Sequence, residues 1–360
     1  AASTTPCPRC AAKPERKFWL TKPEMFQFPA RLIGGGVRQW LDNDREAAIC
    51  ALFRRSFYLE ATNGDLVCIG PAAIGAGPLN MICDLPGGID WEASGLQPGA
   101  RASISDSRIT VVGTYEFDAS DAQTWQPPAL SENWTNATLT SGLAALETAA
   151  PAHDLSDGLA GLVLHYVPEI AAARSGFDGL GIWLDDAIRN PKGELAPPPP
   201  KIASLIGLGP GLTPSGDDLV GGVMIALRMF DHQTAADCLA GWALPIARQN
   251  TGKISIAHLT EAAGGEGADA LHRVIALIAD GDKTGLKPGL DEIDAIGHSS
   301  GWDALAGAVA VMRRMARSWK PRVPRRGHLT AQPIYRLFPT SRPARDRSAD
   351  LPPRRKPTPG

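Results

Sequence analysis

Apolar and polar positions divide the chain into two stretches with different periods. Between Ala47 and Phe117, apolar residues form short β-prone runs that are separated by Gly, Pro, Asn and Asp. Short strands between such turns are typical of a small, mostly antiparallel β domain, either a barrel or a sandwich. Asn63-Gly64 stands between two of these runs. This dipeptide predicts a tight hairpin.

After Pro127-Pro128, apolar residues recur at three and four positions, which is the period of a helix. The predicted helices cover 138–149, 155–172, 179–189, 234–248, 255–263 and 268–279, and a further one follows Ser300. The sequence therefore predicts an α+β fold. In this fold a small antiparallel β domain is followed by a mostly helical domain with glycine-rich loops at helix N-termini.

Composition suggests a tail at each end of this body. Residues 1–30 form a leader without clear periodicity, and the chain from 320 to 360 carries eleven Lys and Arg against two Asp. That tail has a local charge of +9, which leaves −11 for the body. We expect a flexible leader at 1–30, a β-rich domain at 31–128, a helical domain at 129–319 and a disordered basic tail at 320–360. An acidic body predicts no nucleic-acid partner.

The overall composition is that of a soluble globular protein, with 44% hydrophobic and 21% charged residues. No run of eighteen apolar residues and no secretory signal is visible, so we expect no membrane partner. The six cysteines are too sparse for a disulfide-stapled secreted domain, which favours the cytoplasm. Cys7 and Cys10 form a Cys-x-x-Cys, but the nearby ligands that a structural zinc needs are missing.

The most informative stretch is a glycine-dense loop at 207–216 between a β-type apolar run (Ile202 to Ile206) and an apolar helix. Its glycines let the backbone take positive φ angles, and Ser215 is predicted as the helix N-cap. The N–H groups and the positive dipole end of the new helix would point at the same spot. The loop is therefore a candidate anion cradle.

A second copy of the same pattern lies near the end of the helical domain. Ser300-Gly301-Trp302-Asp303 and Gly307 repeat the Ser-Gly-x-Asp-x-x-x-Gly pattern that runs from Ser215 to Gly222. We infer two helix N-termini that are built alike and face one site, with small residues one turn in for close packing. The alternative is that Ser and Asp merely start the two helices.

Three known motifs can be compared with these loops. A P-loop is excluded because no lysine follows Gly216, and a dinucleotide fingerprint that starts at Gly207 meets Leu212 where it needs glycine. Gly297-His298-Ser299-Ser300-Gly301 matches the nucleophile elbow Gly-x-Ser-x-Gly. An elbow needs a buried strand before it, whereas residues 291–296 have helical spacing. A serine hydrolase that uses Ser299 remains an alternative, which a fluorophosphonate probe would test.

Taken together, residues 207–218 and 297–303 resemble the family that includes the H subunit of oxamate carbamoyltransferase. Arg54-Arg55, Gly77-Pro78-x-Asn80, and Thr251-x-x-x-Ser255 ahead of Glu266 support the resemblance, which covers roughly Ala47 to Met315. It implies a subunit of a carbamoyltransferase complex in allantoin breakdown, with other subunits as partners. The family's assigned reaction converts oxalurate and phosphate into oxamate and carbamoyl phosphate, with magnesium.

The residues and the resemblance agree on a site for a small anion. Asp217 and Asp218 would hold Mg²⁺, because hard carboxylate oxygens suit that ion, or would only favour the helix dipole. Asp218 and His298 are the candidate catalytic residues, with His298 as general acid or base. The predicted anion-binding residues are Gly209, Gly211, Thr213, Ser215, Gly216, Ser299, Ser300 and Gly301. The alternative to an enzyme subunit is a non-catalytic scaffold whose loops bind partner backbone.

Overall fold

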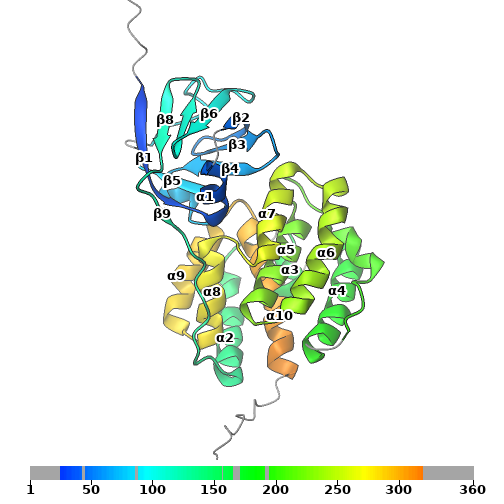
Figure 1. The fold of residues 1–360 in the computed structure, drawn as a ribbon. Helices are drawn as coiled ribbons and strands as arrows, with labels where there is room; N and C mark the ends of the chain where they lie inside the picture. The colour runs from blue at the N-terminus through cyan, green and yellow to red at the C-terminus, as the bar shows by residue number, and fades with distance from the viewer. Residues whose placement is uncertain are drawn as a thin grey trace, which may run out of the picture. The chain divides into compact units, whose positions relative to one another are not determined.

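The computed structural model describes residues 25–318 except 43–44, 86–87, 156, 165–170 and 191–193. The predicted leader up to residue 24, the Cys7–Cys10 motif and the predicted basic tail at 320–360 lie outside these residues. Within the described part, strands come first and helices follow (Figure 1). This order confirms the predicted α+β class.

The N-terminal part is a closed barrel. Its sheet has the order β5-β4-β3-β2-β6-β7-β8-β1, and β5 also pairs with β1, while β9 extends from β1. Closure leaves the eight barrel strands without a free edge. The strands are β1 (Phe26–Ile33), β2 (Arg45–Leu52), β3 (Phe57–Ala61), β4 (Leu66–Gly70), β5 (Asn80–Cys83), β6 (Arg101–Ser105), β7 (Arg108–Val111), β8 (Tyr115–Asp118) and β9 (Gln123–Thr124).

The hairpin predicted at Asn63-Gly64 is confirmed. Strands β3 and β4 pair antiparallel across it, and Gly64 has a φ of 90°. The barrel also contains two parallel pairs, β1 with β8 and β4 with β5, which the expectation of a mostly antiparallel domain did not include. The first strand begins before residue 31 because Phe28 and Ala30 alternate into the core. Phe57, Trp91 and Phe117 fill that core with contacting rings.

The helical part follows the barrel. Among the described residues it contains α2 (Asn136–Ala149), α3 (Ala160–Leu164), α4 (Ala171–Arg189), α5 (Ser215–Met229), α6 (Gln233–Asn250), α7 (Lys253–Gly264), α8 (Asp269–Asp280), α9 (Lys283–Asp294) and α10 (Ser300–Ser318). A short helix, α1 (Gly35–Leu41), belongs to the barrel region. No helix in the described ranges combines the length and apolarity that crossing a membrane requires.

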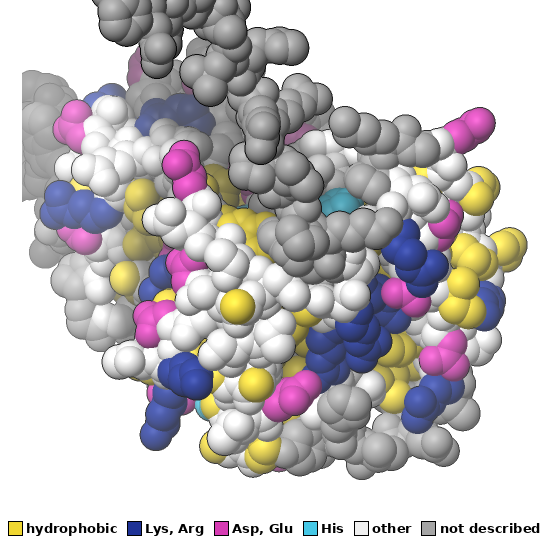
Figure 2. All heavy atoms as spheres, turned by 90° about the horizontal axis from the view of Figure 1, so that it is seen from below, with side chains coloured by type: hydrophobic (Ala, Val, Ile, Leu, Met, Phe, Trp, Pro, Cys, Tyr) yellow, Lys and Arg dark blue, Asp and Glu magenta, His cyan; other side chains and the backbone are white. Residues whose placement is uncertain are grey.

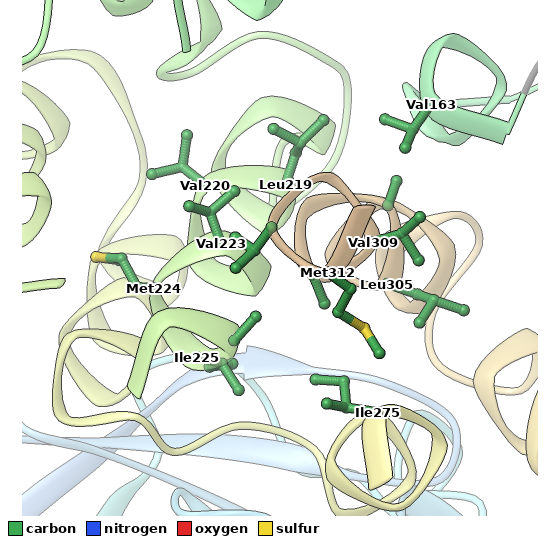
Figure 3. Close-up of a cluster of buried hydrophobic side chains, with 14 of the residues drawn as sticks. Val163, Leu219, Val220, Val223, Met224, Ile225, Ile275, Leu305, Val309 and Met312 are labelled. Carbon is green, nitrogen blue, oxygen red and sulfur yellow. The ribbon is translucent and has the colours of Figure 1, made fainter. Parts of the chain in front are cut away.

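Helices α5 and α10 pack against each other in the middle of the helical core. Leu219 and Val223 of α5 face Leu305, Val309 and Met312 of α10 in this core (Figure 3). The two backbones approach closely because a glycine stands at each crossing point. A Cβ atom on Gly222 would lie 1.8 Å from the Ala304 carbonyl oxygen, and one on Gly307 would lie 2.0 Å from that of Leu219. The small residues predicted one turn into each helix therefore do set the helix spacing.

Two local predictions before α5 were wrong. The apolar run at Ile202 is not a strand but part of a 3₁₀ helix, η3 (Pro200–Leu205), because the prolines before it favour a tight turn. Ser215 is not the N-cap of α5, since Pro214 holds that position and no side chain caps the helix. Ser215 is the first helical residue, and its hydroxyl is free to contact another element.

Polar side chains and a backbone hydrogen bond, from the Asp269 N–H to the Ala76 carbonyl oxygen, join the barrel part to the helices. The indole N–H of Trp125 donates to Asp269 Oδ1 over 2.9 Å, and Lys253 pairs with Glu60 at 2.5 Å. The face seen in Figure 2 carries Lys and Arg side chains with acidic ones beside them. On α10, for example, Arg313 forms an ion pair with Glu147 of α2 at 2.8 Å.

Candidate functional site

The glycine loop before α5 has the backbone that its sequence predicts. Gly207, Gly209 and Gly211 have φ angles of 77°, 120° and 95°. Side chains are also excluded by contact, because a Cβ on Gly207 would lie 2.4 Å from the Asn250 carbonyl oxygen. Gly216 differs from these three. It is helical, and a Cβ there would lie 1.8 Å from the Leu205 carbonyl oxygen, so it packs α5 against η3 instead of allowing a positive φ.

Asp217 fixes this loop in place. Its Oδ1 accepts a hydrogen bond from the Gly207 N–H at 2.8 Å, and its Oδ2 accepts one from the Ser255 hydroxyl at 2.7 Å. The residue is only 1% exposed. Because both carboxylate oxygens have protein partners, Asp217 links the loop to α5 and α7. Its predicted role as a metal ligand has no support in this geometry and stays a prediction.

The start of α10 is anchored by a different residue at the equivalent place. Trp302 donates its indole N–H to Asp294 Oδ1 at 2.8 Å, and its ring lies 4.9 Å from that of His153. Gly297 has a φ of 59° in the turn between α9 and α10. The residues before this turn form α9, which is a helix and not the strand that a nucleophile elbow requires.

The two helix starts meet through their hydroxyl groups. Thr213 Oγ1 lies 2.9 Å from Ser300 Oγ, and Ser215 Oγ lies 3.4 Å from Ser299 Oγ. Each contact joins the first residue of one helix to a residue just before the other helix. The structure thus brings the two sequence copies together at one place, with Gly301 packed against the carbonyl oxygen of Ile293.

Asp303, the acidic residue of the second copy, is fully buried. Its Oδ1 accepts from the backbone N–H groups of Leu159 and Ala160 at 2.5 and 3.0 Å, which ties α10 to the start of α3. Its Oδ2 is buried without a hydrogen-bond partner. Burial raises the pKa of this carboxyl, while the Leu159 N–H and the hydroxyls of Ser215 and Ser299 oppose the rise.

Asp218 occupies the matching position on α5. Its Oδ2 is likewise buried without a hydrogen-bond partner. Burial raises the pKa of the Asp218 carboxyl well above its ordinary value, the hydroxyls of Ser300 and Thr213 oppose this, and the charge of Asp303 adds to it. The charge of Asp303 on α10 thus acts on Asp218 across the helix pair.

His298 lies on the outer side of this arrangement. Its side chain is 87% exposed, and its Nε2 lies 3.2 Å from Asp157 Oδ2. Ser299 and Ser300 are half-buried beside it. The predicted acid or base is therefore close in sequence to the hydroxyl cluster but open to solvent, and its catalytic role stays a prediction.

Sequence reasoning missed a contribution from the barrel. Tyr58 of β3 places its hydroxyl 3.3 Å from Nε2 of His258 on α7. Burial lowers the pKa of His258 to about 4 and raises that of Tyr58 well above its ordinary value, with a smaller contribution from the charge of Asp218. Nothing in a β-prone run marks one tyrosine as different, and a single histidine on a helix gives no sign of such a partner. His272 has a backbone partner instead, since its Nε2 accepts from the Gly267 N–H at 3.1 Å.

The side chains at the two helix starts offer oxygen ligands that Mg²⁺ could use. Within the part of the chain that the structure describes, no group of three or more His, Cys, Asp or Glu side chains could hold a metal ion. Mg²⁺ in enzymes commonly uses one or two carboxylates, several waters and substrate phosphate oxygens. The free carboxylate oxygen of Asp218 and the neighbouring hydroxyls fit that pattern.

The chain is thus an α+β protein in which a barrel precedes the helices. Its candidate site lies where α5 and α10 begin, close to the glycines of both helix starts. The family model described as oxamate carbamoyltransferase subunit AllH matches residues 205–312, and the model for the AllH family N-terminal domain matches residues 29–124. The chain belongs to this family. Searches of curated proteins and of solved structures found no match.

Proposed function

We propose that this chain is a subunit of an oxamate carbamoyltransferase-type complex in allantoin degradation, and that it holds a small anion where α5 and α10 begin. The anion is carbamoyl phosphate, phosphate or an oxalurate-like ureido acid. The family match supports the complex and its other subunits as partners. The observation that supports the anion site is that four hydroxyl side chains lie together at the N-termini of the two helices.

The loop suits an anion for physical reasons. Gly209 and Gly211 are exposed and have positive φ, so their peptide groups lie at the surface beside the N-terminus of α5. Unpaired N–H groups and the positive dipole ends of two helices attract negative charge. Thr213, Ser215, Ser299 and Ser300 add donors that can rotate toward phosphate or carboxylate oxygens.

The buried carboxylates require a compensating charge. Asp218 and Asp303 lie in the same cluster as the proposed anion site, and like charges there would repel a phosphate. Mg²⁺ held by Asp218 supplies a positive charge that neutralises phosphate oxygens when bound. Carbamoyl transfer to phosphate needs no enzyme nucleophile, so the chain's own residues act by positioning the anion and stabilising charge.

Thermal unfolding of the complete chain with phosphate, carbamoyl phosphate and oxalurate, each with and without Mg²⁺, tests this proposal. A ligand at a hundred times its dissociation constant adds about 2.7 kcal/mol, a shift of several degrees. We expect a shift that Thr213→Ala and Ser300→Ala reduce and the exposed control Thr140→Ala does not. Absence of any shift, alone and with partner subunits, would contradict the anion site and favour a scaffold.

A further inference from the structure

Two buried carboxylate oxygens on different helices lack a partner at the same place. They are Oδ2 of Asp218 and Oδ2 of Asp303, each in the first turn of its helix. Asp303 has no exposed surface, so no bulk water reaches its carboxylate. Leaving a buried polar atom unpaired is unfavourable, and more so when the atom is charged, so two such atoms in one cluster indicate a missing ligand.

The environment of the two aspartates is reciprocal. Asp218 of α5 is influenced by the hydroxyl of Ser300, the first residue of α10. Asp303 of α10 is influenced by the hydroxyl of Ser215, the first residue of α5. Gly222 and Gly307 hold the two helices in backbone contact one turn further on. The repeat therefore builds two equivalent halves around one centre.

Protonation pairs each carboxyl only by itself. A protonated Oδ2 becomes a donor, and the hydroxyl oxygens beside each carboxyl can accept from it. A hard cation satisfies both oxygens at once and removes the repulsion between them. Asp217 is not available for the same purpose, because Gly207 and Ser255 already occupy its two oxygens.

We propose that Asp218 and Asp303 together bind one divalent cation such as Mg²⁺, as a two-carboxylate site between the N-termini of α5 and α10. The hydroxyl cluster of Thr213, Ser215, Ser299 and Ser300 surrounds it. This inference rests on the proposed function, because the anion bound by the loop supplies the remaining oxygen ligands. The adjacent Asp217 keeps the loop in shape and does not touch the cation.

The test uses Mn²⁺ as the probe, with the complete chain and no substrate, and follows the free Mn²⁺ signal by electron paramagnetic resonance. We expect one Mn²⁺ per chain, with affinity weakened roughly tenfold or more by Asp218→Asn and equally by Asp303→Asn. Asp303→Asn keeps an Oδ1 acceptor for Leu159 and Ala160, so it should fold. Asp217→Asn is the matched control and should bind Mn²⁺ as the unmodified chain does.

Wild-type affinity in Asp303→Asn, loss in Asp217→Asn alone, or no Mn²⁺ binding to the unmodified chain would each overturn the inference. If Asp303→Asn does not fold, anomalous scattering from Mn²⁺ in crystals of the unmodified chain decides. A peak between Asp218 and Asp303 supports the site, and a peak elsewhere or none overturns it. If the Mn²⁺ test fails, phosphate binding measured in a chelator separates the two proposals, because an anion site that persists without any divalent cation supports the hydroxyl cluster of the proposed function but not the cation site.

Discussion

The starts of α5 and α10 carry the same sequence pattern but are held in different ways. At α5 a long glycine loop is tied down by Asp217, through Gly207 and Ser255. At α10 a short turn is held by Trp302, which contacts Asp294 and His153. The variable position of the pattern is thus the anchor in both copies. The shared Ser, Asp and Gly positions are the ones that meet across the helix pair.

The two shared aspartates also differ in how much structure depends on them. Asp303 uses one oxygen to hold the start of α3 and leaves the other unpaired. Asp218 has the hydroxyls of Ser300 and Thr213 beside it, and no backbone segment depends on it among the described contacts. Equivalent positions of the repeat can therefore differ in how far they hold neighbouring backbone and how far they remain open to a ligand.

The largest expected effect comes from the shared glycines. Gly222→Ala and Gly307→Ala each place a methyl group within 2.0 Å of a carbonyl oxygen on the other helix. We expect a loss of about 3 kcal/mol or more in the free energy of unfolding, measured in urea. Gly241→Ala on α6 is the control, since its Cβ meets nothing within 4 Å, and it should gain about 0.5–1 kcal/mol. Equal behaviour of all three variants would mean that the helices are not in backbone contact.

The anchors should differ next. Asp217→Ala removes the acceptor of two buried hydrogen bonds and should cost about 2–3 kcal/mol, whereas Trp302→Phe loses one indole hydrogen bond and should cost about 1 kcal/mol. Urea unfolding of both variants measures this. Ser255→Ala, which removes only one partner of Asp217, should fall between them. A Trp302→Phe cost larger than that of Asp217→Ala would reverse our ranking of the two anchors.

The two shared aspartates can be compared by pH in the presence of a chelator. Both carboxyls have a raised pKa, so the folded chain binds more protons than the unfolded chain above the ordinary value of 3.8. Stability conferred by the protonated forms is therefore lost as pH rises from that value. Asp218→Asn should flatten this fall and gain about 1 kcal/mol at pH 7, with little change near pH 3.5.

Asp303→Asn should flatten the fall less, because its pKa is raised less strongly. Asp118→Asn is a control of opposite sign. The hydroxyl of Ser120 lowers the pKa of Asp118, so the ionised carboxylate stabilises the fold above the ordinary value of 3.8 and loses this effect as pH falls. Asp118→Asn should therefore be less stable than the unmodified chain above pH 3.8, with the difference shrinking at lower pH. Urea midpoints across the pH range measure all three. A steeper fall for Asp218→Asn than for the unmodified chain would contradict the raised pKa.

The smallest effect on stability is expected at His298. Its ion pair with Asp157 is exposed on both sides, so His298→Ala should change the free energy of unfolding by less than about 0.5 kcal/mol. If His298 acts as general acid or base, the same variant lowers the turnover of the assembled complex by roughly 10²- to 10⁴-fold. Normal turnover would remove His298 from the catalytic candidates.

Local signals predicted much of this molecule. The Asn63-Gly64 hairpin, most helices after Pro128 and the meeting of the two repeat copies follow from turn chemistry, periodicity and the repeat itself. Helix α9 was not among the predicted helices. The parallel pairs and the closure of β5 on β1 depend on long-range pairing, which no local pattern encodes. Ile202 was misread because a short apolar run has the same appearance in a strand and in a 3₁₀ helix.

The sequence predicted that the two repeat copies meet, but not what each residue contacts there. The spacing of the repeat could not show that both carboxylate oxygens of Asp217 accept hydrogen bonds from Gly207 and Ser255. It also could not show that Tyr58 reaches His258 from the barrel, because that contact spans 200 positions. Asp217 and Asp218 have the same chemistry in the sequence. Only their contacts in the structure show that Asp217 holds the loop, whereas one oxygen of Asp218 has no hydrogen-bond partner.

The hydroxyl contacts between the two helix starts have a consequence for synthesis of the chain. Thr213 and Ser300 are 87 positions apart, and contacts of such separation form late because a long segment must be ordered first. A nascent chain that has emerged only as far as α9 holds one half of the centre and none of its reciprocal partners. Ligand binding there would then report that α10 has docked, and a saturating ligand would protect the helical region against proteolysis only after that final step.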